Sequence, residues 1–491
     1  MLRLTPSDLY TFFRPQKCEN RIYLRDKGLE EAPLSPYEEV IRRLGERHEL
    51  AHLSQFPVVA DLRSGSLEDR EKQTREGVQK QISVIYQAVM RASYKFGALE
   101  CEIIGSPDFL IREADNYIIR DSKISRRINE QDHPEIILQL QLYGWLYEQT
   151  FGREPSALEV HAGTGEVIRV PYDGGTGVLG LLEEILVLKT LQSEAYSPVG
   201  WTKCGGCPFH DHCWPRAEKH EDVALVYGVD QGLAAELNRQ GISTITKLIA
   251  DFDEATLADF KRPWGNKFQK VGKKASSILL MARVTASKQE VMIEQPQIPD
   301  FPNYVMFDLE GLPPHLDELD KIYLWGLQVF GEKPSIFLPA LAGFGEDGDK
   351  KGWDAFLKQV EEIFAEYGDI PFVHWHHYER VRIDMYVKRY GDPNGTAARV
   401  RRNLLDLLPV AQKSIALPLA SYSLKVVEKY IGFKRTQDEY GGDWAMAKYI
   451  EATELEDTGE RERVVNDILT YNREDLAATW EVLLWLRSKI N

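Results

Sequence analysis

Residues 203–214, KCGGCPFHDHCW, hold Cys204, Cys207 and Cys213, which are three of the five cysteines in the 491-residue chain. A fourth, Cys18, lies far upstream in the stretch FFRPQKCENRIYL. Three clustered thiols with one distant partner predict a four-thiolate cage that ties the beginning of a domain to its end. Thiolates at such spacing suit zinc or an iron–sulfur cluster. One alternative is three unrelated buried cysteines in a tight loop. Disulfides are less favoured because no secretory signal opens the chain.

The composition is that of an ordinary soluble protein with room for several cores. The length allows about two to four domains. Hydrophobic residues make up 43% and charged residues 28%, and no apolar run is long enough to span a membrane, so we expect a cytoplasmic protein without a membrane partner. The 60 Lys and Arg residues against 76 Asp and Glu residues leave a net charge of −16. This argues against a simple nucleic-acid coat protein. It does not exclude a metal-dependent nuclease, whose active-site carboxylates add negative charge that bound cations offset.

The first half of the chain predicts helices followed by a small sheet. Residues 1–47 read as largely helical, with a helix start at Ser35-Pro36. Residues 74–96 read as a second long helix because apolar residues recur there at three- and four-residue intervals. A later helix would carry Gln139 and Tyr143 one turn apart on one face. The strands expected before that helix are 98–104, 109–113 and 117–123.

Three polar residues of these strands have the composition of a metal site. Asp121 and Lys123 are two residues apart on one strand, so they point to the same side. Asp108, from the neighbouring hairpin arm, can meet Asp121 across the sheet. Two converging carboxylates would hold Mg²⁺ or Mn²⁺, and the lysine could polarise the attacking water or a phosphate oxygen. A solvated Asp–Lys face is the alternative.

The motifs of this half resemble the RecB-like branch of the PD-(D/E)xK nucleases. The matching elements are Gly45-x-x-His48, Gly105-x-x-Asp108, Asp121-x-Lys123 and Gln139-x-x-x-Tyr143, in the family's order. The resemblance implies that His48, Asp108 and Asp121 are metal ligands and that Lys123 is catalytic. It also implies that Gln139 and Tyr143 position DNA or the metal site. A histidine packed in the core is the alternative for His48.

The cysteine layout is also similar to that of RecB-like exonucleases that carry a [4Fe–4S] cluster. The resemblance implies that Cys18, Cys204, Cys207 and Cys213 bind such a cluster. Zinc is the alternative, and His210 and His212, between the last two thiols, could then join the site. We expect the remaining cysteine, Cys101, to be a small core residue.

The middle of the chain predicts a nucleic-acid-binding region. Residues 233–248 and 271–279 resemble the two halves of a helix–hairpin–helix, which holds a phosphate with backbone N–H groups, although the usual Gly-x-Gly hairpin is missing. Between them, KRPWGNKFQKVGKK at residues 261–274 has six basic and no acidic residues. A solvated basic loop is the alternative. The residues expected to contact nucleic acid are Lys261, Arg262, Trp264, Lys267, Phe268, Lys270, Lys273 and Lys274.

The second half begins with the stretch YVMFDLEG at residues 304–311. It predicts a buried strand whose Asp308 and Glu310 face the same way. Near the far end, a helix would place Tyr471 and Asp475 one turn apart on one face. Between these motifs we expect strands at 322–330, 335–338 and 370–374 and an amphipathic helix at 353–367.

This order resembles the DEDD exonucleases of the ribonuclease H-like fold, in their tyrosine variant. The resemblance implies that Asp308, Glu310 and Asp475 hold two metal ions and that Tyr471 orients the attacking water. The family's second motif ends in aspartate, whereas this chain offers Glu379, a longer carboxylate that could serve a metal through water. Residues 404–407 and 421–425 also resemble the bacterial predicted-exonuclease subfamily of the fold. The alternative is a fold of this kind kept for binding after losing catalysis.

The predicted fold class is α/β, with two nuclease domains joined by a small region and a linker. The expected parts are a RecB-like nuclease domain with a four-cysteine cluster at 1–220, a helical hairpin domain at 221–285, a proline-spaced linker at 286–303 and a ribonuclease H-like exonuclease domain at 304–491.

The expected activity is metal-dependent hydrolysis of DNA, at single strands or ends, in repair, recombination or defence. The alternatives are a nucleic-acid-binding scaffold with a weak second domain, and an RNA-processing exonuclease. Related nucleases work beside helicases, so the resemblance also implies a helicase partner.

Overall fold

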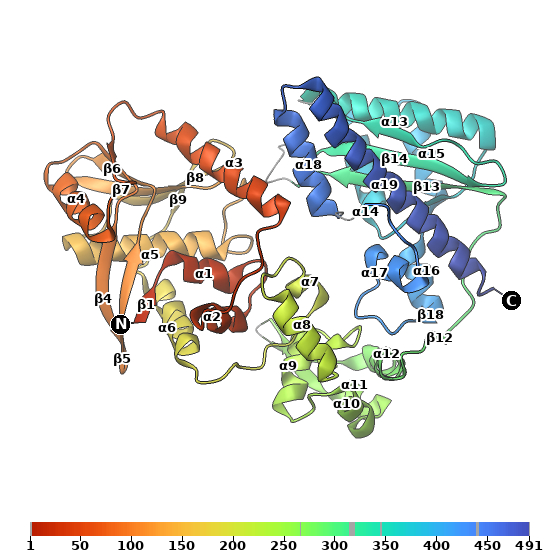
Figure 1. Ribbon diagram of the computed structural model, residues 1–491, viewed down its shortest axis with the longest axis horizontal. Helices are drawn as coiled ribbons and strands as arrows, with labels where there is room; N and C mark the ends of the chain where they lie inside the picture. The colour runs from red at the N-terminus through yellow and green to blue at the C-terminus, as the bar shows by residue number, and fades with distance from the viewer. Residues whose placement is uncertain (1, 266, 314–319, 344–345, 438–440, 491) are drawn as a thin grey trace. The chain divides into compact units, whose positions relative to one another are not determined.

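The computed structural model describes residues 2–265, 267–313, 320–343, 346–437 and 441–490. The chain divides into two compact units (Figure 1). The first comprises Met1–Leu34, Glu38–Ser197 and Thr202–Asp211, and the second comprises Ser35–Tyr37, Pro198–Trp201 and His212–Asn491. None of the described helices is long and apolar enough to cross a membrane.

The first unit contains two sheets. A six-stranded sheet has the order β2-β3-β6-β7-β8-β9, and a three-stranded sheet has the order β1-β5-β4. Within the larger sheet, β6 pairs antiparallel with β7, and β7 pairs parallel with β8. The strands are β1 (Leu2–Leu4), β2 (Ala60–Asp61), β3 (Val84–Tyr86), β4 (Met90–Phe96), β5 (Leu99–Gly105), β6 (Phe109–Glu113), β7 (Asn116–Ser122), β8 (Ala157–His161) and β9 (Val167–Val170).

Helices cover these sheets and complete one hydrophobic core. The central helix α5 packs on β4, β5, β7 and β8 and against α1 and α6, and α2 packs on α1 and α6. Cys101 on β5 is fully buried in this core, as predicted. The helices up to the end of the cysteine-rich stretch are α1 (Pro6–Phe13), α2 (Glu19–Asp26), α3 (Pro36–Leu53), α4 (Leu67–Gln79), α5 (Pro134–Phe151), α6 (Thr176–Thr190), α7 (Trp201–Cys204) and α8 (His210–Lys219).

The helix predicted over residues 74–96 is wrong. Only its beginning is helical, because α4 ends at Gln79 and Gln81 then takes a positive φ of 56°. The following residues form β3 and β4, where the β-branched Val84 and Ile85 and the aromatic Tyr86, Tyr94 and Phe96 suit a pleated surface. The helix and the chain before β4 are joined by the Thr74 hydroxyl oxygen, which accepts a hydrogen bond from the backbone N–H of Val89 at 2.9 Å. The spacing of apolar residues alone did not distinguish one long helix over 74–96 from a short helix followed by two strands.

The second unit begins with a small helical region. Helices α9 (Gln231–Arg239) and α10 (Ile245–Asp251) form the first predicted hairpin, with Gly241 in the left-handed region at φ 80°. Between α11 (Glu254–Asp259) and α12 (Ala275–Ser287) the chain forms an antiparallel pair, β10 (Lys261–Trp264) and β11 (Lys267–Lys270). The basic stretch is therefore a β-hairpin. Short 3₁₀ turns, η1 (Val223–Leu225) and η2 (Gly272–Lys274), complete the region.

A five-stranded mixed sheet organises the rest of this unit, with the order β15-β14-β13-β16-β17. Strand β13 pairs antiparallel with β14 and parallel with β16. Its strands are β13 (Asn303–Gly311), β14 (Ile322–Gly331), β15 (Leu338–Leu341), β16 (Phe372–His374) and β17 (Leu404–Asp406). Its helices are α13 (Glu346–Tyr367), α14 (Tyr378–Tyr390), α15 (Thr396–Asn403), α16 (Leu407–Ser414), α17 (Leu424–Ile431), α18 (Gly442–Glu454) and α19 (Thr458–Arg487).

Alternation along β13 decides what each face of the sheet carries. Phe307 stacks on Phe356 of α13, with ring centroids 5.6 Å apart. The next residue, Asp308, points to the other face, where it meets α19. One face of the strand is therefore hydrophobic core, and the other presents Asp308 to α19.

Two expectations for this unit need correction. The strand predicted at 335–338 is displaced to Leu338–Leu341. Ser335 instead closes a turn at the end of β14, because the backbone N–H of Val329 donates to its hydroxyl oxygen at 2.9 Å and its own N–H donates to the Val329 carbonyl. The predicted linker is not wholly extended, because α12 runs to Ser287 and Lys288 takes a positive φ of 55°. Further along it, β12 (Val291–Met292) pairs antiparallel with β18 (Ile415–Ala416).

Candidate active sites

The first candidate site is built by the register between β6 and β7. Phe109 pairs with Arg120, so Asp108, one residue earlier, lies opposite Asp121. The backbone N–H of Asp108 donates to Oδ1 of Asp121 at 3.1 Å, and the backbone N–H of Ser122 donates to Oδ2 of Asp108 at 2.7 Å. Lys123 Nζ lies 2.6 Å from Asp121 Oδ2. The structure therefore brings together the three residues in which the sequence predicted metal chemistry.

The electrostatics of this first site favour a bound cation. Burial and the neighbouring Asp121 carboxylate raise the pKa of Asp108 well above its usual range. Burial alone would lower the pKa of Lys123, but the Asp121 and Asp108 carboxylates outweigh it and raise that pKa. One ammonium is thus shared between crowded acids, and a divalent cation would supply the missing positive charge.

Gln139 and Tyr143 on α5 brace the turn that carries Asp108. Gln139 Nε2 donates to the Tyr143 hydroxyl at 2.7 Å, and that hydroxyl donates to the backbone carbonyl of Ser106 at 3.1 Å. The Tyr143 ring packs so closely on Gly105 that a Cβ there would lie 2.9 Å from it. These contacts make both side chains positioning groups for the Gly105–Asp108 turn.

Two polar residues of this site, Glu49 and Gln87, were not predicted from the sequence. Gln87 Nε2 donates to Glu49 Oε1 at 2.8 Å and to Asp108 Oδ1 at 3.0 Å, so it links the two carboxylates. Its backbone has a positive φ of 57°, and its N–H donates to the Asp108 carbonyl at 2.7 Å. A strained backbone held by several contacts is typical of a functional position. No motif marks Gln87, whereas Glu49 could have been suspected as the neighbour of His48.

His48 lies at the same end of the sheet but is engaged elsewhere. Its Nε2 is 3.2 Å from the carbonyl oxygen of His161, and the two rings stack with centroids 4.6 Å apart. The same carbonyl accepts the backbone N–H of Lys123 at 2.9 Å. Among the described residues, His48 does not join Asp108 and Asp121 in a group close enough to share one ion.

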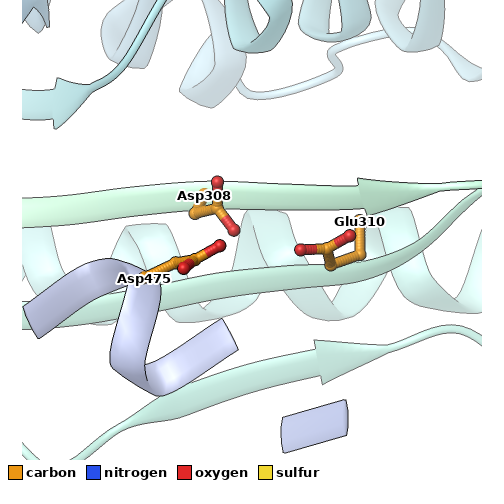
Figure 2. Close-up of side chains that lie close together, drawn as sticks. All are labelled: Asp308, Glu310 and Asp475. Carbon is orange, nitrogen blue, oxygen red and sulfur yellow. The ribbon is translucent and has the colours of Figure 1, made fainter. Parts of the chain in front are cut away.

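The second candidate site is a cluster of three acids. Asp308 and Glu310 come from β13 and Asp475 from α19, and each offers one oxygen within 4.8 Å of the others. Figure 2 shows the two strand carboxylates with Asp475 approaching from its helix. This is the group predicted from the D-x-E and Y-x-x-x-D motifs, and it is the one grouping of three or more possible metal ligands among the described residues.

Crowding of these carboxylates shifts their protonation. Burial and the neighbouring Asp475 raise the pKa of Glu310 to about 8. Burial and the charge of Glu310 raise the pKa of Asp308 well above its usual range. A site that resists ionisation in the absence of a counter-charge is one that a divalent cation would stabilise. The donor set of three buried or half-buried carboxylates suits Mg²⁺ or Mn²⁺.

Asn472 is an unpredicted member of this second site. Its Nδ2 donates to Oδ2 of Asp308 at 2.7 Å, and its side chain is fully buried. It lies against Gly326, which pairs with Asp308 across the β13–β14 ladder, and a Cβ on Gly326 would meet Asn472 Oδ1 at 1.7 Å. The sequence signal was its place between Tyr471 and Asp475, but only the packing reveals its partner.

Glu379 is close to the acids without joining them. It lies in the first turn of α14, buried, and its Oε2 is 3.0 Å from Nδ1 of His374. Its charge contributes to the raised pKa values of Asp308 and Glu310. Within the described part of the chain, however, its carboxylate is not one of the three that can share an ion.

Tyr471 lies beside the second site, among cations. Burial and the charges of Glu310 and Asp475 raise the pKa of its hydroxyl, so it stays protonated. Lys425 Nζ stands over its ring, 4.5 Å from the centroid. Lys425 and Arg435 both contact Asp475.

The structure does not show the predicted four-thiolate cage. Over the described residues, no three thiols come close enough together to share an ion. Cys18 is the N-cap residue of α2, and its charge acts on one thiol of the cysteine stretch, that of Cys207. Burial raises the pKa of the Cys207 thiol, and the charge of Cys18 adds to that rise. Cys204 and Cys207 are joined by a backbone hydrogen bond of 3.1 Å.

The predicted nucleic-acid residues mostly lie on the surface of the β10–β11 hairpin. Trp264 is 58% exposed and Phe268 is 68% exposed, which is unusual for large hydrophobic side chains in a folded region. Lys261 and Lys267 on the hairpin and Lys273 and Lys274 on η2 are also exposed.

Arg262 and Lys270 differ from the other basic residues because their charges are used within the protein. Arg262 is buried, pairs with Asp230 at 2.9 Å and lies under the Trp264 ring. Lys270 pairs with Asp259 at 2.6 Å. We therefore regard Arg262 as a brace for the hairpin.

Family models match two separate segments of the chain. Residues 23–214 match the model of the PD-(D/E)XK nuclease superfamily, and residues 305–487 match that of the RNase H superfamily. Both domains belong to nuclease superfamilies. The first site thus lies in the PD-(D/E)XK domain and the second in the RNase H-like domain. A comparison with curated proteins finds no match. A solved structure described as "Crystal structure of SSO0001" is 17% identical, covering 43% of this chain and 85% of that chain, with a TM-score of 0.23, which is too low to support a conclusion.

Proposed function

We propose that this protein is a nuclease with two metal-dependent centres that hydrolyses DNA at single strands or ends. The observation that carries the proposal is the group of Asp308, Glu310 and Asp475, whose carboxylate oxygens converge within 4.8 Å. These carboxylates would hold Mg²⁺ or Mn²⁺, which would supply activation of a water molecule and positive charge beside the phosphate oxygens.

In the PD-(D/E)XK domain we assign Asp108 and Asp121 to cation binding and Lys123 to the reacting phosphate. The ammonium of Lys123 is held at Asp121, where it can donate to a phosphate oxygen as negative charge develops in the transition state. The Gln87 amide holds the carboxylates of Glu49 and Asp108 in place by donating to both. Gln139 and Tyr143 hold the Gly105–Asp108 turn. His48 remains a candidate ligand whose ring would have to leave its contact with His161.

In the RNase H-like domain we assign Asp308, Glu310 and Asp475 to cation binding. Tyr471 keeps its proton and can hydrogen-bond the attacking water, which orients that water toward the phosphorus. Asn472 fixes the rotamer of Asp308. Glu379 would serve this centre through water, consistent with its position outside the three-acid group.

The hairpin is proposed as the surface that receives the strand. Trp264 and Phe268 can stack on unpaired bases, and the exposed lysines can contact phosphates. Stacking needs bases that are not paired, which favours single strands over duplex.

The test uses the full chain on end-labelled single-stranded and duplex DNA and on RNA of the same sequence, with Mn²⁺ and with EDTA. We expect cleavage of single-stranded DNA that EDTA abolishes. Lys123→Ala and Asp308→Asn should each remove one class of product, and the double variant should be inactive. Binding without cleavage in every arm would favour a scaffold, and cleavage of RNA alone would favour RNA processing.

We further propose that Cys18, Cys204, Cys207 and Cys213 bind a [4Fe–4S] cluster. The support is the spacing of Cys204, Cys207 and Cys213 with Cys18 far upstream. The charge of Cys18 also raises the pKa of the Cys207 thiol. Protein purified without oxygen should be brown and contain iron and sulfide. Cys18→Ser should remove the colour, whereas the matched change Cys101→Ala in the core should keep it. Colourless parent protein with one equivalent of zinc would contradict the cluster.

A further inference from the structure

Two cationic side chains occupy one edge of the RNase H-like site. Lys425, on α17, and Arg435, which follows that helix, both contact Oδ1 of Asp475. One of the two carboxylate oxygens of Asp475, a residue expected to bind metal, is therefore already paired with cationic side chains of the protein.

Arg435 is neutralised by its own partner and serves as a fixed brace. It makes two parallel hydrogen bonds to Glu428, both of 2.7 Å, and its side chain is only 3% exposed. Such a bidentate pair holds the guanidinium in one orientation. The Arg435–Glu428 pair is electrically neutral as a unit, so it orients Asp475 without changing the net charge of the site.

Lys425 has a different setting. Its side chain is 27% exposed, and its ammonium lies between Asp475 and the ring of Tyr471. A lysine carries a compact charge on a flexible stem, so it can exchange one anionic partner for another without moving the backbone. A phosphate that enters beside Tyr471 would lie within its reach.

The carboxylate expected to complete a two-ion site is turned away. Glu379 faces His374 and lies outside the group that can share an ion. Three carboxylates set against the ammonium of Lys425 leave two negative charges, which one divalent cation neutralises. A second divalent cation would leave a surplus of positive charge next to Lys425, which opposes its binding.

We propose that the RNase H-like site binds one divalent cation and that Lys425 supplies the positive charge that a second ion would otherwise provide. In this arrangement the Lys425 ammonium leaves Asp475 when substrate enters and donates to a non-bridging oxygen of the scissile phosphate. The inference rests on the proposed metal dependence of this site and specifies how its charge is divided between ion and side chain.

The decisive measurement is the number of Mn²⁺ ions bound by the full chain, by calorimetry and electron paramagnetic resonance. An Asp121→Asn background removes the PD-(D/E)XK site from the count. In this background we expect one ion, which Asp308→Asn abolishes. Lys425→Gln should admit a second ion or bind the first at least about tenfold more tightly, because a like charge a few ångströms away is gone. Lys425→Arg, which keeps the charge, should still bind one ion.

Cleavage of single-stranded DNA gives the second readout. Lys425→Gln should lower kcat much more than KM, and Lys425→Arg should recover part of the loss. Melting in EDTA checks that each variant is folded. Two ions in the presence of Lys425, or one ion with unchanged affinity in Lys425→Gln, would overturn this inference and leave the metal dependence standing. Mn²⁺ binding that is indifferent to Asp308→Asn would overturn the proposed function of the site and this inference with it.

Discussion

The β10–β11 hairpin allows a quantitative test of nucleic-acid binding. The perturbation is the replacement of Lys261, Lys267 and Lys273 by glutamine. All three side chains are exposed, and within the described residues none of them forms an ion pair with an acid. Their positive charges are thus available to phosphates, unlike that of Lys270, which is paired with Asp259.

The expected size of the effect follows from counterion release. Each phosphate contact on a single strand contributes roughly 0.7 to the slope of log K against log salt concentration. Removal of three contacts should therefore flatten the slope by about 2. Between about 50 and 200 mM salt, the affinity of the triple variant should fall roughly 18-fold less than that of the parent protein.

Binding is measured by fluorescence anisotropy with a labelled single strand, in protein carrying Asp121→Asn and Asp308→Asn to prevent cleavage. The control replaces Lys80, Lys333 and Lys350, which are exposed but paired with Glu76, Glu366 and Asp354. It removes the same formal charge and should leave the slope unchanged. Phe268→Ala should add a loss of ~1–3 kcal/mol for single strands and little for duplex.

An unchanged slope in the triple variant would refute this reasoning and make the hairpin a solvated surface feature. Equal losses in the triple variant and its control would mean that only the net charge of the protein matters. In either case the strand would have to follow another path, first past Arg126 and Arg127 near the PD-(D/E)XK site.

Three further predictions concern the two sites. Lys123→Ala should lower kcat of the PD-(D/E)XK domain about 100- to 1000-fold with DNA binding retained, and an unimpaired rate would show that the site is misassigned. In Gly326→Ala, the new Cβ at residue 326 would lie 1.7 Å from Asn472 Oδ1, so Asn472 should be displaced from Asp308. The displacement should weaken Mn²⁺ binding. The control Gly152→Asn lies in open space at a left-handed helix end, where asparagine is tolerated. Glu379→Asp should be tolerated in single-turnover cleavage, and inactivation would mean that the glutamate length is required.

Much of the architecture could be predicted from local sequence pattern. The hairpin that carries Asp108 and Asp121 follows from alternating apolar residues and turn residues, and the register of β6 and β7 matches that expectation. The strand with Asp308 and Glu310 and the helix with Tyr471 and Asp475 were likewise predicted, because period-two and one-turn spacing place such pairs on one face. The failure over residues 74–96 arose where apolar residues at helical intervals continued into strands.

Only the tertiary structure decided which polar and charged side chains from distant segments contact one another. Glu49 and Gln87 approach Asp108 because α3 and the chain after β3 converge at the same sheet end. Lys425 and Arg435 meet Asp475 from α17 and the loop beyond it, about forty to fifty residues away in the chain. Periodicity specifies the face on which a side chain lies, but the partner across a packed interface depends on the docking of whole elements. Metal affinity and charge balance are therefore properties of the assembled fold.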